Sequence, residues 1–364
     1  MQLNIITGNK GFVGLNLVDY FKRQNKEIIG VSRNPKKEEF SYQTLSLEQL
    51  NQAKSFIHLA GKAHDLKKTS KEKEYFEVNT ELTKELFKQF LESDCEVFIY
   101  MSSVKAAADE LEVVLTEEAI PKPITAYGKS KLAAEAYILA QEIPQNKRVY
   151  ILRPCMIHGP NNKGNLNLLY SFVSKGIPYP FGKYKNARSF VSVENLCFII
   201  NELIDNEKIE SGVYNIADDK SLSTKELVTI ISKTISKKTK IINVPKFLIK
   251  LFAKLGDFLL LPINSERVQK LTENYEVSNK KIKKAIQKEL PLTTEKGIEK
   301  TIEWYGKVFG FSVVEKGKVE DAPYAIIRND GTMLCIYEHA KMMPREHMER
   351  RAYHRTQPGI NHFS

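Results

Sequence analysis

Hydrophobic and polar residues follow two alternating patterns before Pro154. Apolar runs with the length of buried strands occur at residues 3–7, 27–31, 55–59, 96–101 and 148–152. Segments that place their apolar residues on one side of a helix occur at residues 12–23, 72–91 and 126–141. Strands that alternate with helices are typical of a doubly wound parallel sheet, so we predict an α/β fold.

The regular alternation ends after Pro154, where turn-forming residues become frequent. We divide the chain into a first domain at residues 1–158, to which elements near residues 188–220 return, and a smaller substrate domain at residues 159–305. The expected later elements are strands at residues 190–193 and 212–216 and a helix at residues 224–235 with Thr224 as its cap.

The last part of the chain, residues 306–364, has a different pattern and is expected to form an α+β tail. Three short strands are expected at residues 311–315, 324–328 and 333–337. Asn329, Asp330 and Gly331 are expected to form the turn between the last two strands.

The composition is that of a globular protein. The chain has 364 residues, of which 42% are hydrophobic and 27% are charged. No apolar stretch reaches the roughly 20 residues that a membrane-spanning helix needs. The N-terminus lacks the basic start of a signal peptide, so we expect a cytoplasmic protein with no membrane partner.

Charge and cysteine content narrow the possible partners. The formal net charge is +11, but the lysines are spread along the chain without interleaved aromatic residues. We therefore expect a lysine-rich surface and no nucleic-acid partner, while the charge suits phosphorylated substrates. The four cysteines lie far apart and form no CxxC pair, so we expect neither a disulfide framework nor a metal site.

Gly8, Gly11 and Gly14 lie directly between the first expected strand and the first expected helix. In that context glycines permit a tight turn, let the backbone approach a pyrophosphate and let helix and strand pack closely. Amides at the start of the helix, such as those of Phe12 and Val13, then face the phosphates. We predict that this loop binds a dinucleotide.

The second expected strand ends in Val31, Ser32 and Arg33, without the acid that commonly binds the ribose hydroxyls of NAD. A guanidinium matches phosphate geometry, so Arg33 can instead pair with the 2′-phosphate of NADP. A solvent-facing arginine is the simpler interpretation of the same residue. We expect NADP as the cofactor, with NAD as the alternative.

Tyr127 and Lys131 are four residues apart at the start of an expected helix, which puts both side chains on one face. An ammonium beside a phenol is expected to lower the pKa of the phenol, which can then exchange a proton with a sugar hydroxyl or ketone while hydride moves. Ser103 follows the preceding strand and is expected to hydrogen-bond the reacting oxygen, with Ser102 as the alternative.

Together these motifs resemble the extended short-chain dehydrogenase/reductase family, in the nucleotide-sugar branch of its NAD-dependent epimerases and dehydratases. The resemblance covers residues 1–305 and depends on Thr7 to Gly14, His58-Leu59-Ala60, Ser102-Ser103, Tyr127 to Lys131 and Leu152-Arg153-Pro154. It implies a Rossmann-like sheet, an NAD(P)-dependent enzyme and a homodimer through the helices at residues 72–91 and 126–141. His158 departs from the family, which usually has tyrosine before Gly-Pro.

The resemblance also implies roles for single residues. Lys131 would hold the nicotinamide ribose, Pro154 would border the nicotinamide, and Asn79 would be the buried helix asparagine of the family. Leu59, Ala60 and Tyr127 would be further cofactor contacts. The implied ligands of the nucleotide diphosphate and sugar are Asn165, Asn167, Arg188 and Arg267. Arg188 suits a pyrophosphate best, because a guanidinium binds it in a bidentate manner.

Three reactions of this family are possible. A 4,6-dehydratase needs an acid–base pair directly after the catalytic hydroxyl residue, where this chain has Val104 and Lys105, so it ranks last. Arg33 favours an NADPH-consuming 4-keto-6-deoxy-hexosamine 4-reductase of surface polysaccharide biosynthesis over a UDP-sugar 4-epimerase, which recycles bound NAD. A non-catalytic NADP-sensing protein is a further alternative, which the intact Ser103, Tyr127 and Lys131 disfavour.

The tail resembles part of another family. Residues 304–311 and 330–338 are similar to the first half of a glyoxalase/bleomycin-resistance (vicinal oxygen chelate) module, and residues 359–364 to the start of its second half. The resemblance implies metal ligands from both halves, with Glu338 and His362 as two of them. Because the second half is not completed, we expect no complete metal site within one chain.

Overall fold

The computed structural model describes residues 2–36, 39–62, 71–162, 165–258, 264–309, 312–319, 322–329 and 332–337. The chain divides into two compact units, Met1–Thr301 and Ile302–Ser364, and each is described by itself. The first unit contains every residue that we predict for cofactor and substrate binding.

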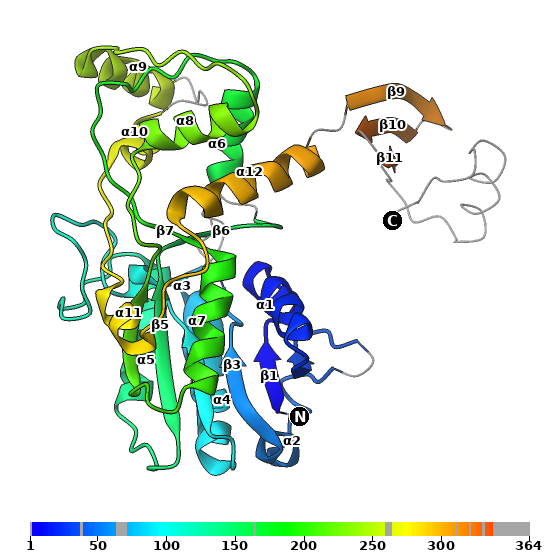
Figure 1. Ribbon diagram of the computed structural model, residues 1–364, viewed down its shortest axis with the longest axis vertical. Coiled ribbons are helices and arrows are strands. Elements are labelled where there is room, and N and C mark those ends of the chain that lie inside the picture. Colours follow the sequence, from blue (N-terminus) through cyan, green and yellow to red (C-terminus); the bar gives the residue numbers. More distant parts are fainter. Residues whose placement is uncertain are drawn as a thin grey trace. The chain divides into compact units, whose positions relative to one another are not determined.

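The first unit is built on a six-stranded parallel sheet with the strand order β2-β1-β3-β4-β5-β8 (Figure 1). Its strands are β1 (Leu3–Thr7), β2 (Glu27–Val31), β3 (Ala53–His58), β4 (Val97–Met101), β5 (Arg148–Pro154) and β8 (Gly212–Ile216). The predicted α/β fold with a Rossmann-like parallel sheet is confirmed. The chain runs from β1 outward to β2 and then returns to the other side of β1, so the strand order reverses there. Ligands of such sheets bind at the carboxyl ends of the strands beside this reversal.

Helices cover both faces of the sheet because its strands are apolar on both sides; every residue of β4, for example, is buried. One face packs against α1 (Phe12–Arg23), α7 (Val193–Asp205) and α11 (Lys280–Ile286). The other face packs against α2 (Leu47–Asn51), α4 (Leu82–Glu92) and α5 (Ala126–Leu139).

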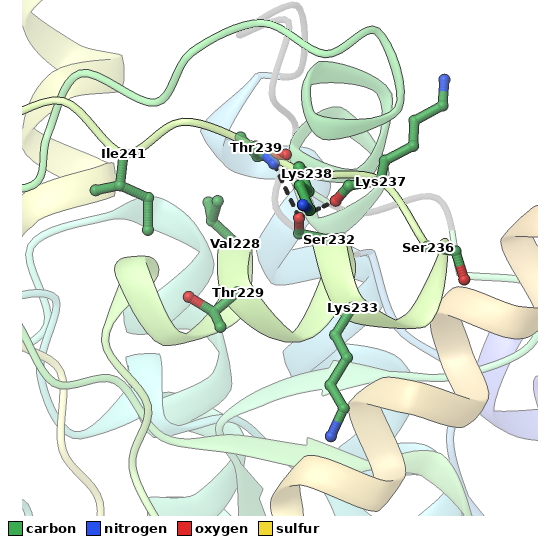
Figure 2. A pocket seen from close by; sticks show the side chains of 9 residues that line it. All are labelled: Val228, Thr229, Ser232, Lys233, Ser236, Lys237, Lys238, Thr239 and Ile241. Carbon is green, nitrogen blue, oxygen red and sulfur yellow. Dashed lines mark hydrogen bonds between the residues drawn. The ribbon is translucent and has the colours of Figure 1, made fainter.

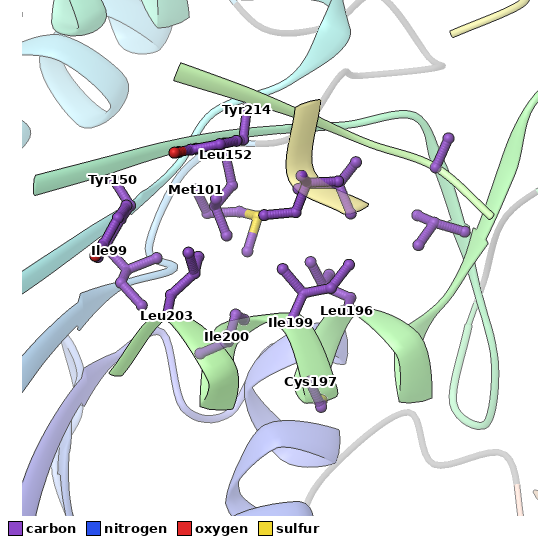
Figure 3. Packing of buried hydrophobic residues seen from close by; sticks show 14 of the residues in the cluster. Ile99, Met101, Tyr150, Leu152, Leu196, Cys197, Ile199, Ile200, Leu203 and Tyr214 are labelled. Atoms are coloured by element: carbon purple, nitrogen blue, oxygen red, sulfur yellow. The ribbon is translucent and has the colours of Figure 1, made fainter. Parts of the chain in front are cut away.

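Helix α7 fills the centre of the first face, where Leu196, Ile199 and Leu203 pack with Met101 and Tyr150 of the sheet (Figure 3). We did not predict this helix. Most of its residues are buried, and its apolar residues directly continue the apolar run of β7, so the sequence does not mark where the strand ends and the helix begins.

The rest of the first unit lies beyond the carboxyl ends of the strands (Figure 1). It contains a two-stranded parallel sheet of β6 (Met156–His158) and β7 (Phe190–Ser192), and the helices α6 (Asn165–Ser174), α8 (Thr224–Thr234), α9 (Lys246–Phe258) and α10 (Ser265–Thr272). The last helix, α12 (Thr294–Phe309), begins in this unit.

The cap of α8 differs from our expectation. Ser223, not Thr224, caps the helix, because its hydroxyl accepts a hydrogen bond from the Glu226 amide at 3.1 Å and the Glu226 side chain bonds back to the Ser223 amide at 2.7 Å. Thr224 is buried instead, and its hydroxyl donates to the Leu271 carbonyl at 2.7 Å.

The second unit contains an antiparallel sheet with the order β11-β10-β9, formed by β9 (Ser312–Val319), β10 (Ala322–Asn329) and β11 (Thr332–Tyr337). The three strands lie close to the ranges expected from the sequence. The resemblance to a vicinal oxygen chelate module is not confirmed. Glu338, His362 and the turn residues Asp330 and Gly331 lie outside the described residues.

Candidate active site

The glycine-rich loop after β1 leaves no room for side chains at two positions. Gly8 has a left-handed backbone with φ of 68°, and a Cβ there would lie 2.8 Å from the Ala60 amide nitrogen. A Cβ on Gly14 would lie 2.3 Å from the Gly8 carbonyl oxygen. Helix α1 starts after Gly11 with no side-chain cap and no acid in its first turn. This is the form of a loop that binds an anion at the start of a helix.

A buried histidine ties the ends of β1 and β3 to α4. His58 Nδ1 lies 2.7 Å from the Thr7 hydroxyl, and His58 Nε2 lies 3.0 Å from the Thr83 hydroxyl. Burial and the nearby Lys131 charge lower the pKa of His58 to about 3, so its ring is neutral at physiological pH. The Thr7 hydroxyl also accepts a hydrogen bond from the Ala60 amide at 3.1 Å, which positions the backbone beside Gly8.

Ser103 and Tyr127 are joined by a side-chain hydrogen bond. Tyr127 lies in the first turn of α5, where the Thr125 hydroxyl caps the helix by accepting from the Gly128 amide at 3.2 Å. Ser103 follows β4 and caps a short 3₁₀ turn, Val104–Ala106, by accepting from the Lys105 amide.

The pKa of Tyr127 differs from our expectation. It is raised, because burial favours the neutral phenol more than the Ser103 hydrogen bond favours the phenolate. Our prediction of a lowered pKa was therefore wrong for this state of the protein. The Lys131 ammonium donates at 2.8 Å to the carbonyl oxygen of Met101, and its charge does not offset the burial of the phenol.

Lys131 is buried and lies one helical turn after Tyr127 in α5. Its ammonium lies 4.9 Å from the centre of the Tyr100 ring, and a Cβ on Gly61 would lie 3.0 Å from it. Burial lowers the pKa of Lys131 to about 8, although the Glu135 carboxylate opposes this shift. Ser103, Tyr127 and Lys131 are called the proposed catalytic group below.

Asn79 occupies a π-helical turn, Glu77–Glu81, that interrupts the helix expected at residues 72–91 between α3 (Glu72–Phe76) and α4. Its side-chain oxygen accepts from the Lys62 amide at 2.8 Å, and its side-chain nitrogen donates to the Lys62 carbonyl and to the Ser130 hydroxyl. Such turns are frequent at functional sites. Here the turn lets Asn79 fix the loop after β3 against α5.

Two residues that we did not predict form an ion pair directly behind the proposed catalytic group. Glu135 and Arg153 are both buried, and the guanidinium Nε lies 3.0 Å and 3.1 Å from the two carboxylate oxygens. The Ser102 hydroxyl donates to the same carboxylate. Ser102 is therefore engaged by Glu135, whereas Ser103 is the serine that meets Tyr127.

The loop after β2 brings an acid to the glycine-rich loop. Arg33 is exposed at the end of β2. Glu39 lies 2.8 Å from the Lys10 ammonium and accepts from the Asn9 side chain at 2.9 Å. Burial raises the pKa of Glu39, but hydrogen bonds from Lys10, the Lys36 amide and Asn9 outweigh it and lower the pKa to about 2. No local sequence signal could identify this acid, because it lies well beyond the end of the strand.

The residues expected on the substrate side are only partly described. The Arg188 guanidinium lies 3.4 Å from the Glu273 carboxylate. Burial lowers the pKa of the Lys105 ammonium, and the positive charge of Arg188 lowers it further. The Asn167 side chain donates to the Asn162 carbonyl at 2.9 Å, which indicates a structural role for its amide. The side chains of Asn165 and Arg267 lie outside the described residues.

An open hollow of about 620 Å³ lies on α8 and the segment that follows it (Figure 2). The Ser232 hydroxyl donates to the Lys237 carbonyl and accepts from the Thr239 amide, so these polar groups are already paired. The hollow contains no residue of the proposed catalytic group and is lined by Val228, Thr229, Ser232, Lys233, Ser236, Lys237, Lys238, Thr239 and Ile241.

The model of the NAD dependent epimerase/dehydratase family matches residues 4–217 of this chain. The chain belongs to this family. Its matched part runs from β1 through β8 and includes the glycine-rich loop and the proposed catalytic group. Members of the family are NAD(P)-dependent enzymes, and this chain is one of the nucleotide-sugar reductase and epimerase type.

Two relatives have names that state different reactions. The chain is 31% identical over 312 residues to a UDP-glucose 4-epimerase of Vibrio cholerae, which covers 82% of this chain and 93% of the relative. It is 24% identical over 267 residues to a dTDP-4-dehydro-6-deoxyglucose reductase of Escherichia coli, which covers 65% of this chain and 83% of the relative.

Solved structures agree in fold. MoeE5 in complex with UDP-glucose and NAD aligns over 85% of this chain and all of its own, with a TM-score of 0.65 and 19% identity. RMD from Pseudomonas aeruginosa, complexed with NADPH, aligns over 84% of this chain and all of its own, with a TM-score of 0.62 and 19% identity. Neighbours of this epimerase/dehydratase fold were thus solved with either nicotinamide cofactor.

Proposed function

We propose that the protein is an NADPH-dependent 4-keto-6-deoxy-hexosamine 4-reductase that acts on a nucleotide-linked sugar in surface polysaccharide biosynthesis. The hydrogen bond between Ser103 and Tyr127, next to the buried Lys131, carries this proposal. Two hydroxyl groups of this kind can both donate to the carbonyl oxygen of a 4-keto sugar.

The glycine-rich loop fits a dinucleotide because Cβ atoms at Gly8 and Gly14 would fill the space against the backbone. The bound cofactor supplies the hydride, which no side chain of the chain can supply. The residues proposed to contact its pyrophosphate are Gly8, Gly11, Phe12, Val13 and Gly14. The residues proposed to border its nicotinamide half are Leu59, Ala60, Asn79, Lys131 and Pro154.

In this reaction Tyr127 is the general acid that gives its phenolic proton to the C4 oxygen. Ser103 hydrogen-bonds the same oxygen and holds it beside the phenol. The positive charge of Lys131 stabilises the tyrosinate that remains. The raised pKa of Tyr127 keeps the phenol protonated before the reaction, as an acid requires.

On the substrate side we propose that Arg188 and Lys105 bind the diphosphate of the nucleotide sugar. Each has a pKa that is lowered chiefly by burial, although the Glu273 charge opposes this shift in both, so a bound anion would further stabilise the two buried cations. Asn165, Asn167 and Arg267 remain proposed sugar or phosphate ligands, and the homodimer through the helices at residues 72–91 and 126–141 remains a prediction.

Replacing Arg33 by alanine is expected to weaken NADPH binding about 10- to 100-fold, because one charge-assisted contact to the 2′-phosphate is lost. Binding of NADH, which lacks this phosphate, should be unchanged. Titration of the nicotinamide fluorescence measures both affinities. Arg23→Ala is the matched control, because Arg23 lies at the C-terminal end of α1, the end opposite the glycine-rich loop. An equal loss for both nucleotides would argue against Arg33 as the determinant.

The rate of sugar reduction is expected to fall as the pH rises through about 8. Burial lowers the pKa of Lys131 to about 8, so its stabilising charge is present below this pH and is lost above it. A pH profile of kcat measures the descending limb. In Lys131→Arg the side chain stays charged, and the limb should move to higher pH. A limb that stays in place in this variant would assign the ionisation to another group.

A 4-epimerase is the second candidate, favoured by the 31% identity to the Vibrio cholerae enzyme. One assay separates the candidates. We would incubate the protein with NADPH and a UDP-4-keto-6-deoxy-hexosamine and follow the absorbance of the reduced nicotinamide. Stoichiometric loss supports the reductase. No loss, together with C4 inversion of a UDP-hexose in the presence of NAD, supports the epimerase. The absence of both activities would favour a non-catalytic NADP sensor.

A further inference from the structure

Helix α9 (Lys246–Phe258) exposes its largest apolar side chains and buries smaller ones. Ile249, Ala253 and Gly256 form the buried stripe, at the spacing of one helix face. The apolar side chains that face solvent are between 47% and 85% exposed and are those of Phe247, Leu251, Phe252, Leu255 and Phe258. A surface helix of a globular protein has the reverse arrangement, because its apolar stripe normally faces the core.

The exposed side of α9 separates into two stripes. At about 100° per residue, the five exposed apolar residues cover an arc of about 140°. Lys246, Lys250 and Lys254 follow at intervals of four residues and form a basic stripe beside this arc. Asp257 lies at the C-terminal end of this basic stripe, where its carboxylate accepts hydrogen bonds from the amide and hydroxyl of Ser265 at 2.9 and 2.5 Å. The exposed side of α9 is therefore apolar along one stripe and basic along the next.

This combination has the chemistry of helices that lie in a membrane interface. Phenylalanine and leucine side chains enter the boundary between headgroups and acyl chains, while lysine ammoniums meet the phosphates of anionic lipids. A second copy packed antiparallel on the same face would instead bring the two lysine stripes to the same edge, and like charges disfavour such a contact. The net charge of +11 adds attraction toward an anionic surface.

A helix of this size lies on a bilayer and does not cross it. Its 13 residues span about 20 Å, less than the roughly 30 Å of a hydrocarbon core. Within the described ranges, no helix is long and apolar enough to cross a membrane. We expected no membrane partner because the sequence has no spanning segment, but that reason does not apply to a helix in the plane of the interface.

We propose that α9 is a membrane-surface anchor, which docks this protein on anionic phospholipid through its apolar arc and its lysine stripe. Figure 1 shows the helix at one end of the first unit, beside α10. The proposal concerns a surface outside the proposed catalytic group. It holds for a reductase and an epimerase alike and does not rest on the proposed function.

The test is co-sedimentation of the full chain with vesicles of phosphatidylcholine alone and of phosphatidylcholine with one third phosphatidylglycerol. We expect binding to the anionic vesicles and at least about tenfold weaker binding to the neutral ones, because the lysines contribute only where lipid charge is present. Raised salt should weaken binding to the anionic vesicles for the same reason.

Two variants of α9 separate the apolar from the basic contribution. Phe247→Ser/Phe252→Ser/Phe258→Ser should abolish vesicle binding, because the inserted apolar surface is lost. Lys250→Gln/Lys254→Gln should weaken binding to anionic vesicles about fivefold per lysine and leave binding to neutral vesicles unchanged. The matched control is Val113→Ser/Ile120→Ser, which removes apolar side chains of similar exposure outside α9 and should bind like the unchanged chain.

Several outcomes would overturn the proposal. The first is that the unchanged chain does not bind anionic vesicles. The second is that it binds them and neither α9 variant reduces the binding. A third is a dimer in sedimentation equilibrium that the phenylalanine variant dissociates while vesicles bind nothing, since a second copy would then cover the face. Melting temperatures verify that the variants fold, and the lysine variant alone decides the outcome if the phenylalanine variant does not.

Discussion

We expect the Tyr127→Phe variant to lose sugar-reducing activity by about 10²- to 10⁴-fold in kcat, because the proton donor to the C4 oxygen is removed. The ring is kept, so packing against Tyr75, whose ring centre lies 6.3 Å away, is preserved. The measurement is the rate of NADPH oxidation at saturating sugar. Cofactor affinity should change little, since the phenol is assigned to the reacting oxygen.

The matched control for this variant is Tyr137→Phe on the same helix, whose ring packs against Phe87 away from Ser103. It should keep full activity and an unchanged melting temperature. A Tyr127→Phe enzyme that retains more than about a tenth of the wild-type kcat would contradict the assignment, because another group would then be donating the proton.

Breaking the ion pair of Glu135 and Arg153 is expected to have the largest effect on stability. Either Glu135→Gln or Arg153→Met should lower the free energy of unfolding by about 3–5 kcal/mol, because the remaining charge is left buried without its partner. Both side chains are almost inaccessible to solvent, so water cannot compensate. Urea-induced unfolding of each variant measures the loss.

The double variant Glu135→Gln/Arg153→Met is the informative control. It removes both charges, so it should be clearly more stable than the sum of the two single losses predicts. Lys300→Met, which breaks an exposed pair with Glu194, should cost less than about 1 kcal/mol. Strictly additive losses in the double variant would mean that the pair is not coupled and that each side chain contributes by packing.

Much of the fold followed from local sequence patterns. The strands of the main sheet match the apolar runs, because a strand buried on both faces is apolar throughout. Helix α7 was missed because its apolar residues continue the apolar run of β7 without a turn signal between them. The π-helical turn at Asn79 was also missed, since one extra residue in a helix leaves the apolar pattern of the segment nearly unchanged.

In the candidate site, too, some features could be predicted from local sequence and others depended on tertiary packing. Tyr127 and Lys131 could be found together because four residues in a helix put them on one face. The choice between Ser102 and Ser103 could not be made, because it depends on which way each side chain points from the end of β4. Ser102 meets Glu135, and Ser103 meets Tyr127, which only the packing of α5 against the sheet decides.

By itself, the sequence determined the parallel α/β sheet, the glycine-rich loop after β1, the Tyr127 and Lys131 spacing and the family. These features are local, because periodicity, turn chemistry and helical spacing act within a few residues of each other. Only the tertiary structure decided the Glu135–Arg153 pair, the approach of Glu39 to Lys10 and the raised pKa of Tyr127. Each of these depends on burial or on contacts between distant segments, and neither is encoded in the pattern of any single segment.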